Sequence, residues 1–248
     1  VTSLKRTAHT YIQHRAPLLL LGIILIIAAA IRLPGIGTDA LWHDEVIPAS
    51  LVFLPFEELI VSLHSGVHPP LYSVVLKLVS MTVSPEQWTE GVIRSVSLLF
   101  GLLSIWMIYG VGHKLINQNV GLISAFLLAI NPMHVHYSRE ACSYMLLILL
   151  VTASIWVVTY FRERPSTKLA IICGVLMALL AYTHNIANLV ILSMLMCFLL
   201  PRSRLRSPSH RKALVVMGLT GIVLYLPWAT SFLQQTSLVL GPGISPTH

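Results

Sequence analysis

Seven long stretches of the sequence are almost free of charge, and polar runs separate them. They lie at about 16–33, 93–113, 119–138, 141–161, 168–185, 186–200 and 213–232. Most approach the roughly 20 apolar residues that a helix needs to cross a bilayer, and the two shortest need long side chains at their ends that reach the headgroups. The pattern predicts an all-α, polytopic membrane protein with about seven transmembrane helices.

The first of these stretches has the layout of a signal peptide as well as that of a membrane anchor, because basic residues precede it. A signal peptide ends at a cleavage site with small residues. Here the sequence continues with the bulky run Ile-Arg-Leu-Pro at 31–34. We therefore expect a helix that is retained.

The stretch at 69–84, PPLYSVVLKLVSMTVS, decides the topology. Its polar residues Ser73, Lys77, Ser80 and Ser84 would lie along one side of a helix, and its apolar residues would lie on the other sides. This pattern predicts a helix that lies in the membrane interface and does not cross the bilayer.

Basic residues support that topology. If 69–84 does not cross, the cytoplasmic side with the N-terminus collects twelve of the 16 basic residues, in agreement with the positive-inside rule: Lys5, Arg6, Arg15, Lys114, Arg162, Arg164, Lys168, Arg202, Arg204, Arg206, Arg211 and Lys212. If it did cross, the basic run at 201–212 would be exported. We expect a multi-pass protein of the inner (plasma) membrane.

Composition agrees with this location. The chain is 56% hydrophobic and only 10% charged, with a mean hydropathy of +0.80, so it has too little polar surface for a soluble globule. Orientation and contact with anionic lipid headgroups account for the net charge of +7, and we predict no nucleic-acid partner.

The acidic residues gather on the opposite, extracytoplasmic side. Only Glu163 lies inside, and the other eight lie outside: Asp39, Asp44, Glu45, Glu57, Glu58, Glu86, Glu90 and Glu140. Most of them belong to one loop of about sixty residues, roughly 33–92, within a single membrane domain that spans 1–248. Loops of this length are usually functional, so we place the chemistry here, and we expect a further extracytoplasmic segment to start at 233–248.

Two adjacent acids stand in this loop, in the motif HDE at 43–45. They are either solvated loop residues or a general base. A carboxylate shielded by Leu41 and Trp42 would have a raised pKa and would accept a proton from a hydroxyl. The nearby His64 and His68 have a zinc-like spacing, but Gly66 and Pro69 argue against a helix across them.

A second polar motif, HVHYSREA at 134–141, follows Asn131-Pro132, where the helix should kink or break. On a helix His134 and His136 would point about 200° apart, which suits a ligand pair poorly. Arg139 and Glu140 form either an ion pair that marks a substrate site at the mouth of the bundle or a structural salt bridge.

Few cations remain on the extracytoplasmic side to hold an anionic ligand: Arg32, Lys77, Arg94 and Arg139. Arginine suits a phosphate best because its donors form a fixed fork. His184, in the motif THN, lies at another turn on the same side. The cysteines Cys142, Cys173 and Cys197 fall within predicted helices, and we predict no disulfide.

Taken together, HDE, HPPLY at 68–72, GVIRSVS around Arg94 and YSREACSY after a kinked helix resemble the membrane glycosyltransferases of the GT-C superfamily. The likeness is greatest to the protein O-mannosyltransferase and bacterial family 39 branch, and it runs from about 15 to 233. Members of this superfamily usually continue past the seventh helix, so the chain resembles a truncated or minimal member.

The resemblance implies transfer of a sugar, with inversion, from a polyprenyl-phosphate donor to an acceptor hydroxyl on an envelope glycan, lipid or protein. Asp44 would be the base, with Glu45 beside it. Arg94, Arg139 and Lys77 would bind the donor phosphate, and His68, Glu140 and His184 would bind substrate. The resemblance implies no cofactor, although some members use a divalent metal, and Glu140 either pairs with Arg139 or holds such an ion.

Two other functions are weighed against this one. A transporter or flippase-like protein for lipid-linked solutes should carry ionisable residues deep in its helices and repeated halves, and neither is evident in the sequence. A catalytically inactive membrane subunit would share the fold and retain only part of the motif set.

Overall fold

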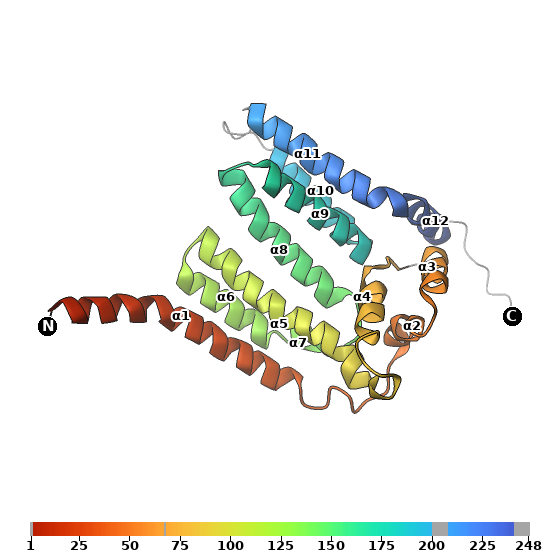
Figure 1. The fold of residues 1–248 in the computed structure, drawn as a ribbon, viewed down its shortest axis with the longest axis horizontal. Coiled ribbons are helices and arrows are strands. Elements are labelled where there is room, and N and C mark those ends of the chain that lie inside the picture. The colour runs from red at the N-terminus through yellow and green to blue at the C-terminus, as the bar shows by residue number, and fades with distance from the viewer. Residues whose placement is uncertain (1, 67, 200–207, 241–248) are drawn as a thin grey trace. The chain divides into compact units, whose positions relative to one another are not determined.

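The computed structural model describes residues 2–66, 68–199 and 208–240, and every element in these ranges is a helix (Figure 1). In chain order the elements are α1 (Thr2–Arg32), α2 (His43–Leu51), α3 (Phe56–Ser65), α4 (Leu71–Ser80), η1 (Pro85–Gln87), α5 (Glu90–Leu115), α6 (Gln118–Ile130), α7 (Pro132–Ser138), α8 (Tyr144–Glu163), α9 (Thr167–Thr183), α10 (Ala187–Leu199), α11 (Pro208–Tyr225), η3 (Leu226–Trp228) and α12 (Ala229–Leu240). The predicted all-α class is confirmed.

The chain divides into two compact units. Unit 1 consists of Val1–Glu45 and Glu86–Thr159, and unit 2 consists of Val46–Pro85 and Tyr160–His248. The first division follows the HDE motif directly, and the second falls within α8. Of the segment expected at 233–248, the part to 240 belongs to α12, and 241–248 lies outside the described residues.

Three helices of the described chain are long and apolar enough to cross a membrane: Glu90–Leu115, Tyr144–Glu163 and Pro208–Gln234. The bent pair α6 and α7 makes a fourth if it counts as one span. Shorter apolar helices at Ala16–Arg32, Thr167–Thr183 and Ala187–Met196 coincide with the other predicted stretches. The protein is therefore a multi-pass membrane protein, and the count of seven stays a prediction.

The expected kink at Asn131-Pro132 is confirmed, since α6 and α7 meet at an angle of 63°. Pro132 is the first residue of α7, a position where the missing N–H costs nothing. The side-chain oxygen of Asn131 accepts a hydrogen bond from the His134 N–H at 3.0 Å and so caps the new helix. The bend thus follows from a proline and a cap at adjacent positions.

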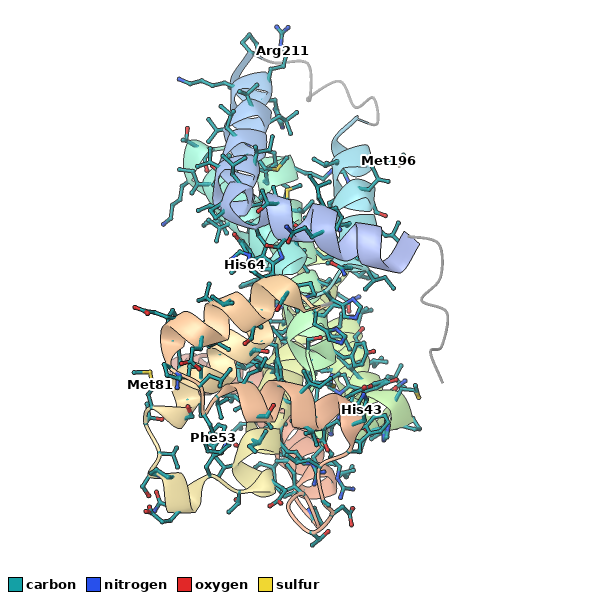
Figure 2. The ribbon with its side chains drawn as sticks, turned by 90° about the vertical axis from the view of Figure 1, so that its right-hand side faces the viewer. His43, Phe53, His64, Met81, Met196 and Arg211 are labelled. Carbon is teal, nitrogen blue, oxygen red and sulfur yellow. The ribbon has the colours of Figure 1, made fainter. Side chains whose placement is uncertain are left out.

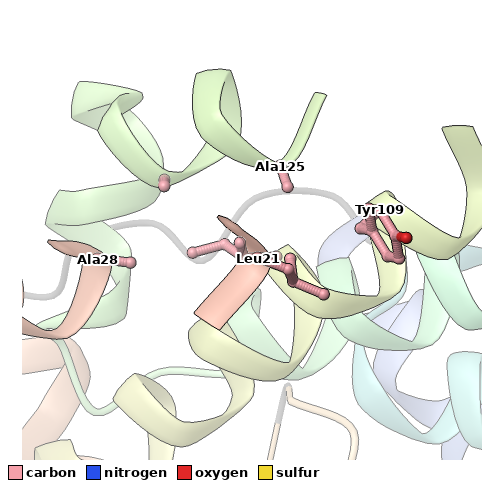
Figure 3. Packing of buried hydrophobic residues seen from close by; sticks show 6 residues of the cluster. Leu21, Ala28, Tyr109 and Ala125 are labelled. Atoms are coloured by element: carbon pink, nitrogen blue, oxygen red, sulfur yellow. The ribbon is translucent and has the colours of Figure 1, made fainter. Parts of the chain in front are cut away.

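Small residues form the core of unit 1, where α1, α5 and α6 pack together (Figure 3). The cluster contains Leu21, Ala28, Ile105, Tyr109, Ala125 and Ala129. α5 and α6 approach most closely at Gly112 and Gly121, where a Cβ added to Gly112 would lie 2.8 Å from the Gly121 Cα. This close backbone approach is typical of helix packing in membranes.

Unit 2 is built on α9 and α11, which meet at Gly174. The short amphipathic helix α3 buries Leu59 and Leu63 against Trp228 of η3. His64, which lies toward α12 in Figure 2, makes a short hydrogen bond to the Ser231 hydroxyl and packs on the Trp228 ring. A segment early in the loop is thereby attached to the last described helices.

α4 is the predicted interfacial helix, but its polar stripe faces the protein. Ser73 is buried, and the Lys77 ammonium donates hydrogen bonds to the carbonyls of Val52 at 2.7 Å and Leu54 at 2.9 Å. The outward residues are apolar, and Met81 just past the helix end is 70% exposed (Figure 2). Lys77 therefore binds the backbone of the segment between α2 and α3. The expectation that its ammonium group reaches a lipid phosphate does not agree with these contacts.

The cysteines differ in part from the expectation. Cys142 lies in the turn before α8, not in a helix, because the chain remains irregular until Tyr144. Cys173 lies within α9, and both thiols are buried and free. The side chain of Cys197, in α10, lies outside the described residues.

Candidate active site

The site is built where the chain leaves α1. Gly35 adopts a φ of +69°, a conformation that favours glycine, and turns the chain after Arg32. Arg139, just after α7, donates a hydrogen bond from Nη2 to the Pro34 carbonyl at 2.7 Å. This bond ties the start of the first loop to the end of α7, both within unit 1.

The two acids of the HDE motif have opposite surroundings. Asp44 is exposed, and its carboxylate makes no hydrogen bond or ion pair with any described residue. Glu45 is fully buried and accepts four hydrogen bonds. On one oxygen these come from the Arg94 Nε at 2.8 Å and the Ala141 N–H at 2.7 Å, and on the other from the Arg94 Nη2 at 2.7 Å and the Trp42 N–H at 3.2 Å.

These bonds fix the charge of Glu45. Burial favours the neutral acid, but the hydrogen bonds from Arg94, Ala141 and Trp42 outweigh it, so the pKa of Glu45 lies below its ordinary value. The raised pKa expected of a shielded acid in this motif is therefore wrong for Glu45. The residue is an anion at neutral pH and joins the first loop, α5 and the turn before α8.

Arg94 is committed to the same junction. Besides the two bonds to Glu45, its Nη1 donates to the carbonyls of Ile36 at 3.0 Å and Asp39 at 2.8 Å, and its Nη2 donates to the Ala40 carbonyl at 3.1 Å. A guanidinium has five N–H donors, and all five are used. The expectation that Arg94 binds the donor phosphate does not agree with this geometry, because it has no donor left for a ligand.

Glu140 pairs with a residue that the sequence did not suggest. Its Oε1 lies 3.0 Å from the Nε2 of His136, one helical turn earlier, and the expected pair with Arg139 is not found. The Glu140 side chain is 13% exposed and that of His136 is 59% exposed. Burial raises the pKa of Glu140, and the nearby carboxylates of Glu45 and Asp44 act in the same direction, whereas His136 and Arg94 oppose it.

Arg139 keeps unused donors. The only hydrogen bond that its side chain makes to a described residue is the one from Nη2 to Pro34, which leaves Nε and Nη1 for a ligand. The side chain is half-buried and lines a cavity of about 830 Å³ in unit 1. Among the arginines of unit 1 whose side chains the structure describes, Arg139 is therefore the one best placed to hold an anion.

The cavity is lined by polar side chains and by a set of apolar ones, here called the apolar wall. The charged and polar lining residues are Asp39, Glu45, Arg94, His136, Arg139 and Glu140. The apolar ones are Ile31, Ile36, Trp42, Ile130, Pro132 and Val135. Its volume falls within the range of small-molecule sites, and its lining suits a ligand with an anionic, hydroxyl-rich head and an apolar tail.

A buried network around Arg32 was not foreseen. Arg32 is fully buried and donates to the carbonyls of Ala28 at 2.8 Å and Ala129 at 2.9 Å and to the Nδ1 of His134 at 2.8 Å. The Nε2 of His134 lies 2.9 Å from the Ser104 hydroxyl. His134 therefore accepts at Nδ1 and donates at Nε2, so it is neutral, and it points away from the exposed His136 as predicted.

The remaining predicted residues belong to unit 2. His68 is exposed, and His184 ends α9, where its Nδ1 accepts the Ile186 N–H at 3.1 Å. Burial lowers the pKa of His184, and the nearby His68 adds to this effect. His64 is engaged by Ser231, and no cluster of three His, Cys, Asp or Glu side chains that could hold a metal occurs within the described ranges.

Comparisons with known proteins agree with the resemblance found in the sequence. A family model described as dolichyl-phosphate-mannose-protein mannosyltransferase matches residues 67–230, more than half of the chain. That range contains six of the eight predicted site residues and leaves out Asp44 and Glu45. No curated protein matches the chain.

A solved structure is similar in fold. It is the Archaeoglobus fulgidus oligosaccharyltransferase, tethered through a disulfide bond to an acceptor peptide with the NVT sequon. The TM-score is 0.66 at 13% sequence identity, over 89% of this chain and 31% of that one. The match confirms the predicted GT-C fold, and this chain spans less than a third of the length of that enzyme.

Proposed function

Because the chain belongs to the dolichyl-phosphate-mannose-protein mannosyltransferase family, we propose that it transfers a sugar from a polyprenyl-phosphate donor to an acceptor hydroxyl, with inversion at the anomeric carbon. The family's name points to a mannosyl group on a lipid phosphate and to a protein acceptor. Envelope glycans and lipids carry hydroxyl groups as well, so they are acceptors of the same chemical class. The active site faces the extracytoplasmic side, with the N-terminus in the cytoplasm.

One observation carries this proposal: the cavity of unit 1 brings an arginine with free donors, carboxylates and an apolar wall into one space. Arg139 supplies Nε and Nη1 to a phosphate. The apolar wall accommodates the first isoprene units of the lipid. Together they orient a donor with its headgroup at the membrane surface and its tail toward lipid.

Asp44 is the base in this proposal. It is exposed at the start of α2, next to the buried Glu45–Arg94 pair that fixes the backbone on its C-terminal side. Its carboxylate is unbonded among the described residues and therefore available to a substrate hydroxyl. The acceptor oxygen attacks the anomeric carbon as Asp44 takes its proton, and the lipid phosphate leaves from the opposite face.

The test is a transfer assay with the purified chain in lipid, a panel of radiolabelled polyprenyl-phosphate sugars and envelope acceptors. Wild type should move the label, and Asp44→Asn should lower turnover by about 100-fold or more with donor binding unchanged. Turnover of Asp44→Asn at the wild-type rate would remove Asp44 as the base. Donor binding without transfer by the wild type would favour a transporter or an inactive subunit.

A further inference from the structure

Two carboxylates of unit 1 are set apart by their surroundings. Asp44 is exposed and unbonded among the described residues, whereas Glu140 is largely buried, lines the cavity and pairs with His136. The charge of Asp44 acts on Glu140, and two interacting carboxyl groups with such different environments commonly serve as base and acid of one reaction. The phosphate that leaves in the proposed reaction gains negative charge, which a proton donor in the same cavity would neutralise.

We infer that Glu140, paired with His136, is the general acid that protonates the departing lipid phosphate. This inference rests on the proposed function and adds a catalytic role to a residue expected only to bind substrate. It follows from the position of Glu140 in the cavity, its neighbour Arg139 and its contact with an exposed imidazole.

The position of Glu140 in the cavity is consistent with a role at the donor phosphate. Glu140 directly follows Arg139, and both side chains line the same cavity. A phosphate held by the free Nε and Nη1 of Arg139 would therefore share this cavity with the Glu140 carboxyl group. His136 is also part of the lining, and its 59% exposure places the imidazole in contact with water. The 3.0 Å contact between its Nε2 and the Glu140 Oε1 then forms a path for protons between solvent and the buried acid.

Burial and neighbouring charges together raise the pKa of Glu140 above its ordinary value. The charged groups that face it are His136, Asp44 and the ion pair of Glu45 with Arg94. Burial raises the pKa of Glu140, the two carboxylates add to the rise, and the two basic side chains reduce it. The acid thus stays protonated to a higher pH than an exposed glutamic acid does.

The chemistry balances with both acids. The acceptor oxygen forms a bond to the anomeric carbon and gives its proton to Asp44, while the bond from that carbon to the phosphate oxygen breaks and its electron pair goes to the phosphate. The departing monoester has a second pKa of about 6, so it accepts a proton from Glu140 as its charge grows. Asp44 then releases its proton to water, and Glu140 regains one through His136.

The test is the pH dependence of kcat for the full chain in lipid, with a radiolabelled polyprenyl-phosphate sugar. Wild type should lose activity as pH rises through the raised pKa of Glu140. Glu140→Gln should lower kcat by about 100-fold or more and abolish this alkaline limb, and its Kd for unlabelled polyprenyl phosphate should stay within about threefold of wild type. Glu86→Gln, at an exposed acid of the same unit, is the matched control and should keep the wild-type profile.

His136→Gln gives an independent readout, because a purely structural role for the pair would not move a pH limb. His136 lowers the pKa of Glu140, so its removal should shift the alkaline limb to higher pH. An unchanged limb in both Glu140→Gln and His136→Gln, with wild-type transfer intact, would overturn the inference and leave the proposed function standing. Absence of transfer by the wild type would overturn both.

Discussion

Replacement of Glu45 by glutamine tests whether Glu45 has a structural role in the HDE motif that Asp44 does not share. All four groups that surround the Glu45 carboxylate are N–H donors: Nε and Nη2 of Arg94 and the backbone of Trp42 and Ala141. A glutamine has one oxygen and one NH₂ in place of two oxygens. In either orientation its NH₂ therefore faces donors, and Arg94 becomes a buried cation that has lost its ion-pair partner.

The cost follows from these contacts. Removal of one partner from a buried ion pair typically destabilises a protein by about 3–5 kcal/mol. Arg94 would still donate to three backbone carbonyls. The N–H donor that faces the glutamine NH₂ would lose its acceptor, so we expect a destabilisation within this range of about 3–5 kcal/mol. At about 2–4 °C per kcal/mol for a chain of this size, the melting temperature should fall by about 6–20 °C.

Asp44→Asn is the matched control, since the two acids are adjacent and only one is buried. A change at an exposed, unbonded side chain should alter stability by less than about 0.5 kcal/mol. Thermal unfolding in detergent, followed by fluorescence, measures both variants. The reasoning is refuted if Glu45→Gln melts with the wild type, or if Asp44→Asn loses as much stability as Glu45→Gln.

Three further outcomes are expected. Arg139→Gln should raise the Kd for polyprenyl phosphate by about tenfold or more, because a charge-assisted bond contributes about 1.5–3 kcal/mol, and Arg139→Lys should recover only part of it; titration of labelled lipid measures this. The pKa of Glu45 is lowered in the fold, so its contribution to stability is complete above its unfolded pKa of about 4.3 and is lost as pH falls through its lower folded value; melting curves from pH 6 to pH 3 should show an acid loss that Glu45→Gln lacks. Gly112→Ala should destabilise by about 2 kcal/mol or more, because its Cβ would lie 2.8 Å from the Gly121 backbone, whereas Gly22→Ala, with open space around it, should melt with the wild type.

Hydropathy was enough to predict the helical class, and Pro132 was enough to predict the kink, because apolar length and a proline act locally. It did not predict which acid of the HDE motif is buried. That depends on donors from Arg94 and Ala141, which lie 49 and 96 residues further along the chain. The sequence likewise shows that residue 94 is an arginine, which suits a phosphate, but it does not show that distant backbone carbonyls already accept its hydrogen bonds. The pairing of Glu140 with His136 is the exception, because a spacing of four residues could have suggested it.

The bonds of Arg32 set an order for biogenesis. Its partners Ala129 and His134 follow it by 97 and 102 residues, so they do not exist when α1 enters the membrane. At about 5–20 residues per second, the guanidinium waits about 5–20 s for them during synthesis. Until then the headgroup region must solvate it, which keeps the end of α1 at the bilayer surface. The C-terminal end of α1 can therefore reach its final position only after the α6–α7 bend has been synthesised and inserted.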